Sequence, residues 1–355
     1  MELFAGLWLG LQTALTPINM LYCLIGVFVG TLIGVLPGLG PAATVAMLLP
    51  ASFVLPPASS LIMLAGIYYG AQYGGSTTSI LVNLPGEASS IVTCIDGYQM
   101  ALKGRAGVAL ATAAICSFFA GSVTTIIIAL FAPPLANVAL KFGPAEYFSL
   151  MVLGLVCSVV LASGSLLKAI GMIVVGLLLG VIGTDVSSGA QRFTFGIPEL
   201  MDGIGFVTVA MGLFGIGEII LNLDHEGTKE RKIHTLSSFV PTREDWKRMV
   251  APTLRGTILG AFLGILPGGG ALVASFAAYS VEKKISKHSN EFGKGAIEGV
   301  AAPESANNAG AQASFIPMLT LGIPTSPVMA LMIGAMIIQG VQPGPGMMTE
   351  QPALF

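Results

Sequence analysis

Long apolar runs separated by short polar stretches dominate this chain of 355 residues. A shorter run, Leu3–Leu15, predicts a short membrane helix or an interfacial helix at the N-terminus. Four later runs are long enough for helices that cross a hydrocarbon core of roughly 30 Å. They are Ala106–Phe131, Tyr147–Ala162, Leu166–Gly183 and Glu199–Asn222. The pattern therefore predicts an all-α integral membrane protein.

A proline- and glycine-rich break interrupts the apolar pattern twice, in the same register. The first copy reads GTLIGVLPGLGP at Gly30–Pro41, and the second reads GAFLGILPGGG at Gly260–Gly270. Further on, Gly70-Ala71-Gln72 is echoed by Gly310-Ala311-Gln312, and Leu84-Pro85 by Ile323-Pro324. In hydrocarbon such a break frees backbone N–H and C=O groups that must find partners. The repetition indicates that the breaks serve the function.

The distribution of Lys and Arg orients the chain. By the positive-inside rule, Asp96–Arg105, Asp224–Lys247 and Glu282–Lys294 face the cytoplasm. The apolar segment Leu254–Ser280 then lies between two cytoplasmic stretches, so it must enter the membrane and return as a re-entrant hairpin. The matching hairpin in the first copy is Ile18–Leu55.

The segments after the two hairpins, Leu61–Ile95 and Ala301–Gly340, each make one net crossing with more residues than a span needs. Each is therefore predicted to contain an unwound stretch or a second partial hairpin. An odd number of crossings separates the two copies, which gives two inverted-topology repeats of the kind found in secondary transporters. The predicted order is an N-terminal helix (1–17), repeat 1 (18–105), four scaffold helices (106–222), a basic cytoplasmic loop (223–253), repeat 2 (254–340) and a tail (341–355).

Composition supports the membrane assignment. Hydrophobic residues make up 54% and charged residues only 10% of the chain, against about a quarter charged in soluble domains. The 46 glycines indicate close helix contacts and interrupted helices. The net charge of −2 and the lack of a basic, aromatic-rich patch do not indicate nucleic-acid binding.

Polar residues of the apolar segments gather in corresponding parts of the two repeats. Broken helices present free N–H groups and positive dipole ends that attract carboxylates, whereas hydroxyls and unwound carbonyls suit a small cation. We predict that the substrate is bound by Pro37, Gly38, Gly40, Ser76, Thr77, Asn83, Pro85, Gly86, Gly268, Gly269, Gly270, Asn307, Asn308, Pro324, Thr325 and Ser326. Coupling to sodium or a proton is predicted at Thr78, Ser79, Glu304, Gln312, Thr320 and Gly322.

Plainer interpretations remain open for these residues. Pro37 and Pro267 can mark simple kinks, and the hydroxyls from Ser76 to Ser79 can bond to carbonyls one turn back. Glu87 and Glu304 are either interfacial loop residues or protonatable coupling groups.

Other classes of function lack their signatures. A channel is the alternative to a transporter, but no charged ring or filter strand is present. An intramembrane enzyme with a serine nucleophile needs a base, and no His lies in an apolar segment. An ATP-driven pump would need a phosphate-binding GxxxxGK[ST] loop, which is absent.

Four stretches together resemble the large membrane subunit of the tripartite tricarboxylate transporter family, TctA. They read LPGLGPAAT, GGSTTSILVNLPGE, LPGGGALVASF and APESANNAGAQASFIPMLTLGIPTSP. The resemblance implies a multi-pass permease of the bacterial inner membrane that takes up tricarboxylates or related carboxylates. It also implies a small membrane subunit, a periplasmic binding protein, a sodium or proton gradient in place of ATP, and no organic cofactor.

An elevator-like movement of a hairpin-bearing domain fits both the resemblance and the repeats. Contact with membrane lipid is expected, and homodimerisation is an open alternative. Because members of this family run longer, the chain is expected to be a fragment or a truncated product.

Overall fold

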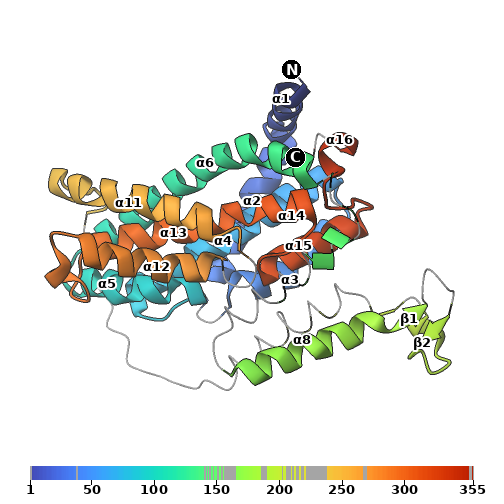
Figure 1. Ribbon diagram of the computed structural model, residues 1–355. Helices are drawn as coiled ribbons and strands as arrows, with labels where there is room; N and C mark the ends of the chain where they lie inside the picture. The colour runs from blue at the N-terminus through green and yellow to red at the C-terminus, as the bar shows by residue number, and fades with distance from the viewer. Residues whose placement is uncertain are drawn as a thin grey trace.

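The computed structural model describes residues 2–36, 39–139, 165–184, 190–201, 238–266 and 270–351, together with scattered single positions and residue 354. Most of these residues are helical. In Figure 1 helices α2 to α6 and α11 to α15 form one bundle, and α8 runs along its lower edge. A two-stranded antiparallel sheet, in which Gly183 pairs with Arg192, follows α8. The described part of the chain therefore fits an all-α membrane protein.

The described helices and strands follow one another along the chain in a fixed order. Their bounds are α1 Glu2–Ala14, α2 Pro17–Gly34, α3 Pro41–Ser52, α4 Pro57–Val82, η1 Ala88–Ser90, α5 Ile91–Leu102, α6 Ala106–Ala139, α8 Leu166–Val181, β1 Gly183–Thr184, β2 Gln191–Arg192, η2 Pro198–Leu200, α11 Arg243–Leu263, α12 Gly270–Ile285, η4 Ser289–Glu291, α13 Glu298–Ala313, α14 Phe315–Leu321, α15 Pro327–Ile338 and α16 Met347–Glu350.

Helices α2 and α4 pack backbone against backbone. A β-carbon on Gly30 would lie 2.3 Å from the carbonyl oxygen of Ile67, and one on Gly34 would lie 2.3 Å from that of Ala71. Only glycine permits this approach, as at other close crossings of membrane helices. Because successive glycines of α2 meet successive turns of α4, the two helices run parallel, and α3 is the returning segment between them.

The second copy packs in the same way through α11 and α13. A β-carbon on Gly260 would lie 2.4 Å from the carbonyl oxygen of Ala306, and one on Gly264 would lie 2.4 Å from that of Gly310. The glycines that recur in the sequence thus have the same packing role in both copies. The opposite orientation of the copies in a membrane stays a prediction.

The helix before the second break of each copy also ends alike. Helix α4 is capped by Asn83 with φ 56°, and α14 is capped by Gly322 with φ 69°. Both residues adopt the left-handed backbone conformation, which ends many helices and favours Gly or Asn. The interruptions therefore lie at residues 83–87 and 322–326, whereas Gly74–Ser79 continues as α-helix within α4.

Two of the described helices are long and apolar enough to cross a membrane, namely Pro17–Gly34 and Ala106–Phe131. The second is one of the four predicted scaffold spans, and α6 continues beyond it to Ala139. Helix α8 corresponds to the predicted span Leu166–Gly183. Most of Tyr147–Ala162 and Glu199–Asn222 lies outside the described residues.

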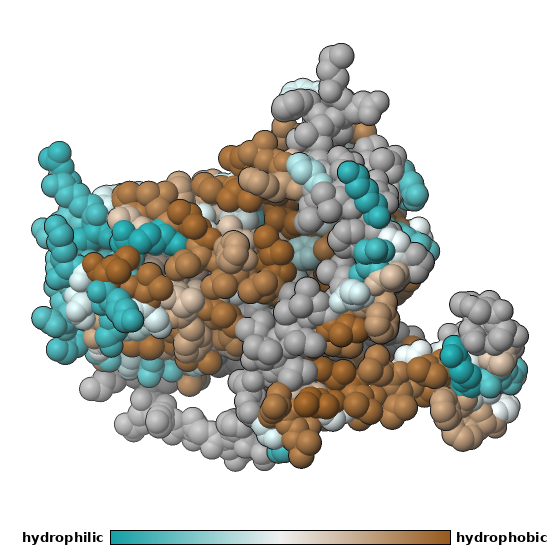
Figure 2. Space-filling model, viewed as in Figure 1, coloured by the Kyte–Doolittle hydropathy of each residue, from teal (hydrophilic) through white to brown (hydrophobic). Residues whose placement is uncertain are grey.

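The predicted cytoplasmic segments contact one another at one end of the bundle. The Arg105 guanidinium pairs with Asp245 at 2.5 Å, and the Lys103 ammonium donates to the carbonyl of Lys294. Figure 2 shows hydrophilic side chains gathered over this end, where α11 begins and α12 ends. The clustering agrees with the placement of all three segments on one side of the membrane.

The buried carboxylate of Asp96 holds this end together. It accepts a hydrogen bond from the Tyr279 hydroxyl at 2.9 Å. Three backbone N–H groups of the loop before α13 also donate to it, those of Gly293, Gly295 and Ala296, at 2.7–2.9 Å. Asp96 is fully buried, so these four donors take the place of its hydration.

Helix α11 begins inside the segment predicted as the basic loop 223–253. Thr242 and Asp245 form a reciprocal capping box, which defines the first turn at Arg243. The tips of the two hairpins, at residues 37–38 and 267–269, lie outside the described residues.

Candidate functional site

A cavity of about 670 Å³ lies where the interruptions of the two copies meet. We call it the hairpin cavity. Its lining comes from residues 40–43, 86–89, 270–272 and 324–328, together with Tyr68, Gln72 and Ala330. The volume falls within the range of small-molecule sites, about 300–1,000 Å³.

Three helices begin at the wall of this cavity. Helix α3 starts at Pro41 after Gly40, α12 starts at Gly270, and α15 starts at Pro327 after Ser326. The first N–H groups of a helix lack partners within the helix and carry its positive dipole end. The Ser326 hydroxyl satisfies one of them by accepting from the Met329 N–H. The cavity wall therefore has the electrostatic character of an anion site.

Two buried polar atoms of the cavity wall have no hydrogen-bond partner among the described residues. They are Oε1 of Gln72 and the hydroxyl of Thr325, on side chains that are 2% and 1% exposed. An unpaired buried polar atom costs free energy. These two atoms therefore keep unused hydrogen-bonding capacity at the cavity wall.

Beside the cavity, the carboxylate of Glu304 on α13 is held by hydroxyls from three other helices. Ser76 of α4 donates to it at 3.0 Å, Thr93 of α5 at 2.5 Å and Ser117 of α6 at 3.4 Å. Glu304 is 1% exposed. No Lys or Arg pairs with it in the described part of the chain, so its charge has only neutral partners.

A second carboxylate, that of the half-buried Glu87, lines the cavity and connects it to this region. It accepts hydrogen bonds from Ser89 at 2.5 Å and from the Asn307 amide at 3.0 Å. The Asn307 carbonyl accepts in turn from Gln72 at 3.0 Å. Asn307 therefore joins repeat 2 to two cavity residues of repeat 1.

The chain matches the family described as Tripartite tricarboxylate transporter TctA family over residues 20–355. It belongs to this family. An uncharacterised 52.8 kDa protein in the TAR-I ttuC′ 3′ region of Agrobacterium vitis is 63% identical over 355 residues, which cover all of this chain and 71% of the relative. A second A. vitis protein, from the TAR-II ttuC′ 3′ region, is 70% identical over 96 residues, 27% of this chain and 40% of the relative. No solved structure matches the chain.

In this TctA-family chain, part of the predicted substrate set lines the hairpin cavity. The lining residues of that set are Gly40, Gly86, Gly270, Pro324, Thr325 and Ser326. Four others, Pro37, Gly38, Gly268 and Gly269, lie outside the described residues. Ser76, Asn307 and Asn308 do not line the cavity but belong to the hydrogen-bond network behind it, in which Asn308 donates to Ser117 at 2.7 Å.

The remaining predicted residues have local roles in the described structure. Thr77, Thr78 and Ser79 bond to the carbonyls one turn back in α4, which is the plainer interpretation of these hydroxyls. Ser79 also contacts the Ser90 hydroxyl at 2.9 Å. Thr320 does the same in α14. Asn83 and Gly322 are left-handed helix caps, and Pro85 and Gln312 do not line the cavity.

The sequence interpretation did not assign Gln72, Tyr68, Thr93 and Ser117 to the site. Gln72 had a usable signal, because Gly70-Ala71-Gln72 recurs as Gly310-Ala311-Gln312. Thr93 and Ser117 are single hydroxyls on apolar helices, and their convergence on Glu304 follows only from the packing of α5 and α6 against α13.

Proposed function

We propose that the chain is the permease subunit of a secondary transporter that takes up tricarboxylates or related carboxylates. The observation that carries the proposal is the hairpin cavity, where three helix N-termini from both copies meet beside two unpaired buried polar atoms. The helix N-termini suit carboxylate groups without a salt bridge. The unpaired Gln72 oxygen suits a donor on the substrate or a bound water.

The network behind the cavity is proposed to couple transport to a gradient. A buried carboxylate with only neutral partners is stable when it takes up a proton or a cation. Glu304 meets this condition. The half-buried Glu87 accepts hydrogen bonds from Ser89 and Asn307, and Asn307 links it to Gln72 in the cavity wall. We propose Glu304 as the main coupling group, with a proton or sodium as its ligand.

Matched packing of the copies supports inverted repeats as the basis of alternating access. The pairs α2–α4 and α11–α13 use equivalent glycines, and both copies break just before the cavity. An elevator-like displacement of the hairpins relative to the scaffold would expose the cavity to each side in turn. Membership in a tripartite family supports a small membrane subunit and a periplasmic binding protein as partners, in the bacterial inner membrane.

Uptake into proteoliposomes tests this function. The chain is reconstituted with its small subunit and saturating binding protein, and uptake of radiolabelled citrate, succinate and benzoate is measured with and without inward sodium or proton gradients. We expect at least one acid to accumulate only when a gradient and the binding protein are present. Flux that equilibrates without a gradient and does not saturate would instead establish a channel.

Glu304→Gln tests the coupling assignment in the same vesicles. We expect loss of gradient-driven accumulation, while exchange of preloaded for external substrate continues because the cavity is unchanged. Glu199→Gln, which neutralises an exposed carboxylate in η2, is the matched control and should behave as wild type. Full accumulation by Glu304→Gln would remove Glu304 from the mechanism.

A further inference from the structure

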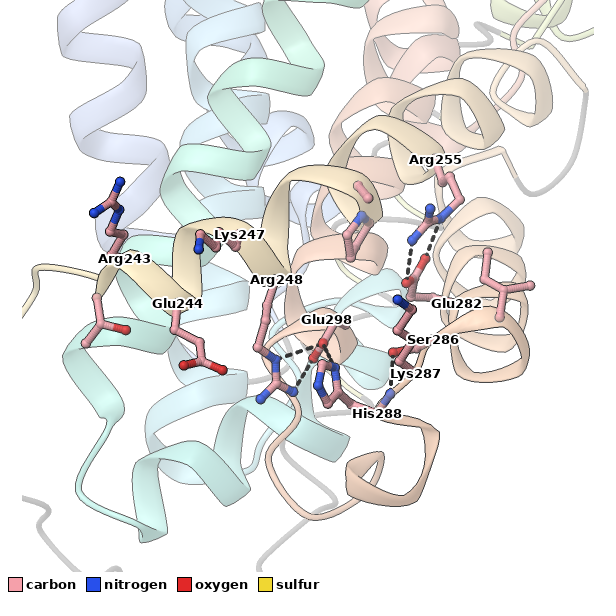
Figure 3. A pocket seen from close by; sticks show the side chains of 14 residues that line it. Arg243, Glu244, Lys247, Arg248, Arg255, Glu282, Ser286, Lys287, His288 and Glu298 are labelled. Carbon is pink, nitrogen blue, oxygen red and sulfur yellow. Dashed lines mark hydrogen bonds and ion pairs between the residues drawn. The ribbon is translucent and has the colours of Figure 1, made fainter.

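A second hollow lies far from the hairpin cavity, at the end of the bundle assigned to the cytoplasm. It has a volume of about 990 Å³ and lies between the beginning of α11 and the end of α12 (Figure 3). We call it the basic groove. Its charged lining residues are Arg243, Glu244, Lys247, Arg248, Arg255, Glu282, Lys287, His288 and Glu298.

Two buried carboxylates of the groove are fully engaged by arginines. Arg255 donates to both oxygens of Glu282, at 2.8 and 2.7 Å. Arg248 donates to both oxygens of Glu298, at 2.9 and 2.7 Å, and His288 contacts the same carboxylate at 2.9 Å. These pairs fix the floor of the groove and leave little negative charge to attract other cations.

The remaining charges of the groove are mostly positive. Arg243, Lys247 and Lys287 are exposed, and none of them makes a contact drawn in Figure 3. No carboxylate pairs with them in the part of the chain that the structure describes. Glu244 is the one exposed carboxylate among the described lining residues. The groove therefore keeps an excess of positive charge available for an anion.

An apolar stripe continues the groove along α11. Ile258 follows Arg255 by three residues and Phe262 follows Ile258 by four, which places all three on one face of the helix. The side chains of Ile258 and Phe262 are 69% and 73% exposed. On α12, Ile285 lines the groove and is 53% exposed. The basic end of the groove thus adjoins an exposed hydrophobic face, just as the charged headgroup of a phospholipid adjoins its acyl chains.

We propose that the basic groove binds an anionic phospholipid of the cytoplasmic leaflet. The phosphate lies near Arg243 and Lys247 on the first turns of α11, and Lys287 adds positive charge on the α12 side of the groove (Figure 3). The acyl chains cover Ile258 and Phe262. Basic pockets on the cytoplasmic side of membrane helices are suited to such headgroups, and each nearby Lys or Arg strengthens the attraction. The site is separate from the proposed transport function and does not depend on it.

Quenching of tryptophan fluorescence tests this site, because Trp246 is next to Lys247 and 44% exposed. The chain has two tryptophans, so Trp8→Phe leaves Trp246 as the reporter. The purified full chain in a neutral detergent is titrated with phosphatidylglycerol or phosphatidylcholine brominated on the acyl chains near the headgroup. We expect phosphatidylglycerol to quench at a concentration roughly ten- to a hundredfold lower, and added salt to reduce this preference.

Matched variants separate the groove from general surface charge. Arg243→Gln, Lys247→Gln and Lys287→Gln together should abolish the preference for phosphatidylglycerol. The control removes three exposed lysines that do not line the groove, by Lys168→Gln, Lys283→Gln and Lys284→Gln, and should keep the preference.

Three results would overturn the proposal. They are equal quenching by the two lipids in the parent protein, equal loss of preference in the control, and displacement of the lipid by millimolar glycerol phosphate. The last would indicate a free-phosphate site. The comparison of the two lipids needs only the parent protein, so the test holds even if a variant is unstable.

Discussion

Replacement of Asn307 by leucine removes the link between the two copies at the hairpin cavity. Leucine has a similar volume, so the packing of α13 against its neighbours changes little. The Nδ2 donor to Glu87 and the Oδ1 acceptor from Gln72, each at 3.0 Å, are both lost. Among the described residues, Gln72 then has no partner for either amide atom, because its Oε1 is already unpaired there.

The size of the effect follows from these two contacts. Leaving a buried donor or acceptor unpaired costs about 1–3 kcal/mol for each group. A total of about 3 kcal/mol against the binding-competent arrangement corresponds to roughly a hundredfold weaker substrate binding, at 1.4 kcal/mol for each factor of ten. We therefore expect uptake per folded molecule to fall by about two orders of magnitude at subsaturating substrate.

Asn19→Leu is the matched control for this experiment. Asn19 is also buried, and it loses two comparable contacts, to the Thr13 carbonyl at 2.7 Å and from Ser59 at 2.6 Å, on helix α2 outside the cavity. Both variants should lower the midpoint of thermal unfolding, but only Asn307→Leu should lower uptake per folded molecule. Equal uptake by the two variants would refute the assignment of Asn307 to the site.

Three further predictions concern the bundle itself. Gly260→Ala should lower the free energy of unfolding by about 1–3 kcal/mol through overpacking. Gly121→Ala is the control and should not, because no atom apart from its chain neighbours and the backbone of its own helix lies within 4 Å of the added carbon. Denaturation in detergent compares the two variants, and equal stabilities would refute the close packing of α11 against α13. Asp96→Ala removes the acceptor of four donors, of which those of Tyr279 and Ala296 belong to buried residues. It should destabilise the fold by about 3 kcal/mol, seen as early loss of hydrogen-exchange protection in the loop before α13. The Arg248 guanidinium lowers the pKa of Glu291, so this ion pair should stabilise the fold above the ordinary glutamate pKa and lose its effect as the pH falls through the lowered value. In Glu291→Gln, stability should therefore depend less on pH below about pH 4. An unchanged dependence would contradict the pairing.

Periodicity and repeated breaks in the sequence predicted the helical architecture well. Proline and glycine interrupt helices for local steric reasons, so Gly34 and Gly264 could be recognised as equivalent before their packing was visible. The positive-inside rule likewise predicted that Asp96–Arg105 and the two later basic stretches share one side, and they contact one another.

The composition of the site depended on tertiary packing that the sequence does not show. A run such as Ser76–Ser79 has the same local pattern whether its hydroxyls bond within the helix or across it, and only Ser76 reaches Glu304. Asn83 is polar and lies at a break, but its left-handed conformation makes it a helix cap. Ser117 became part of the network because α6 packs against α13, a contact between distant segments.

Equilibrium binding to a protein with a filled cavity tests the central claim most directly. Ala42 lines the hairpin cavity, whereas Ala51 lies exposed on the same helix, α3. Binding of citrate, succinate and benzoate to wild type, Ala42→Phe and Ala51→Phe is measured by isothermal titration calorimetry. We predict that the acid bound by wild type binds at least about tenfold more weakly to Ala42→Phe, a loss of about 1.4 kcal/mol, and normally to Ala51→Phe. Equal affinity of all three proteins would show that carboxylates bind elsewhere.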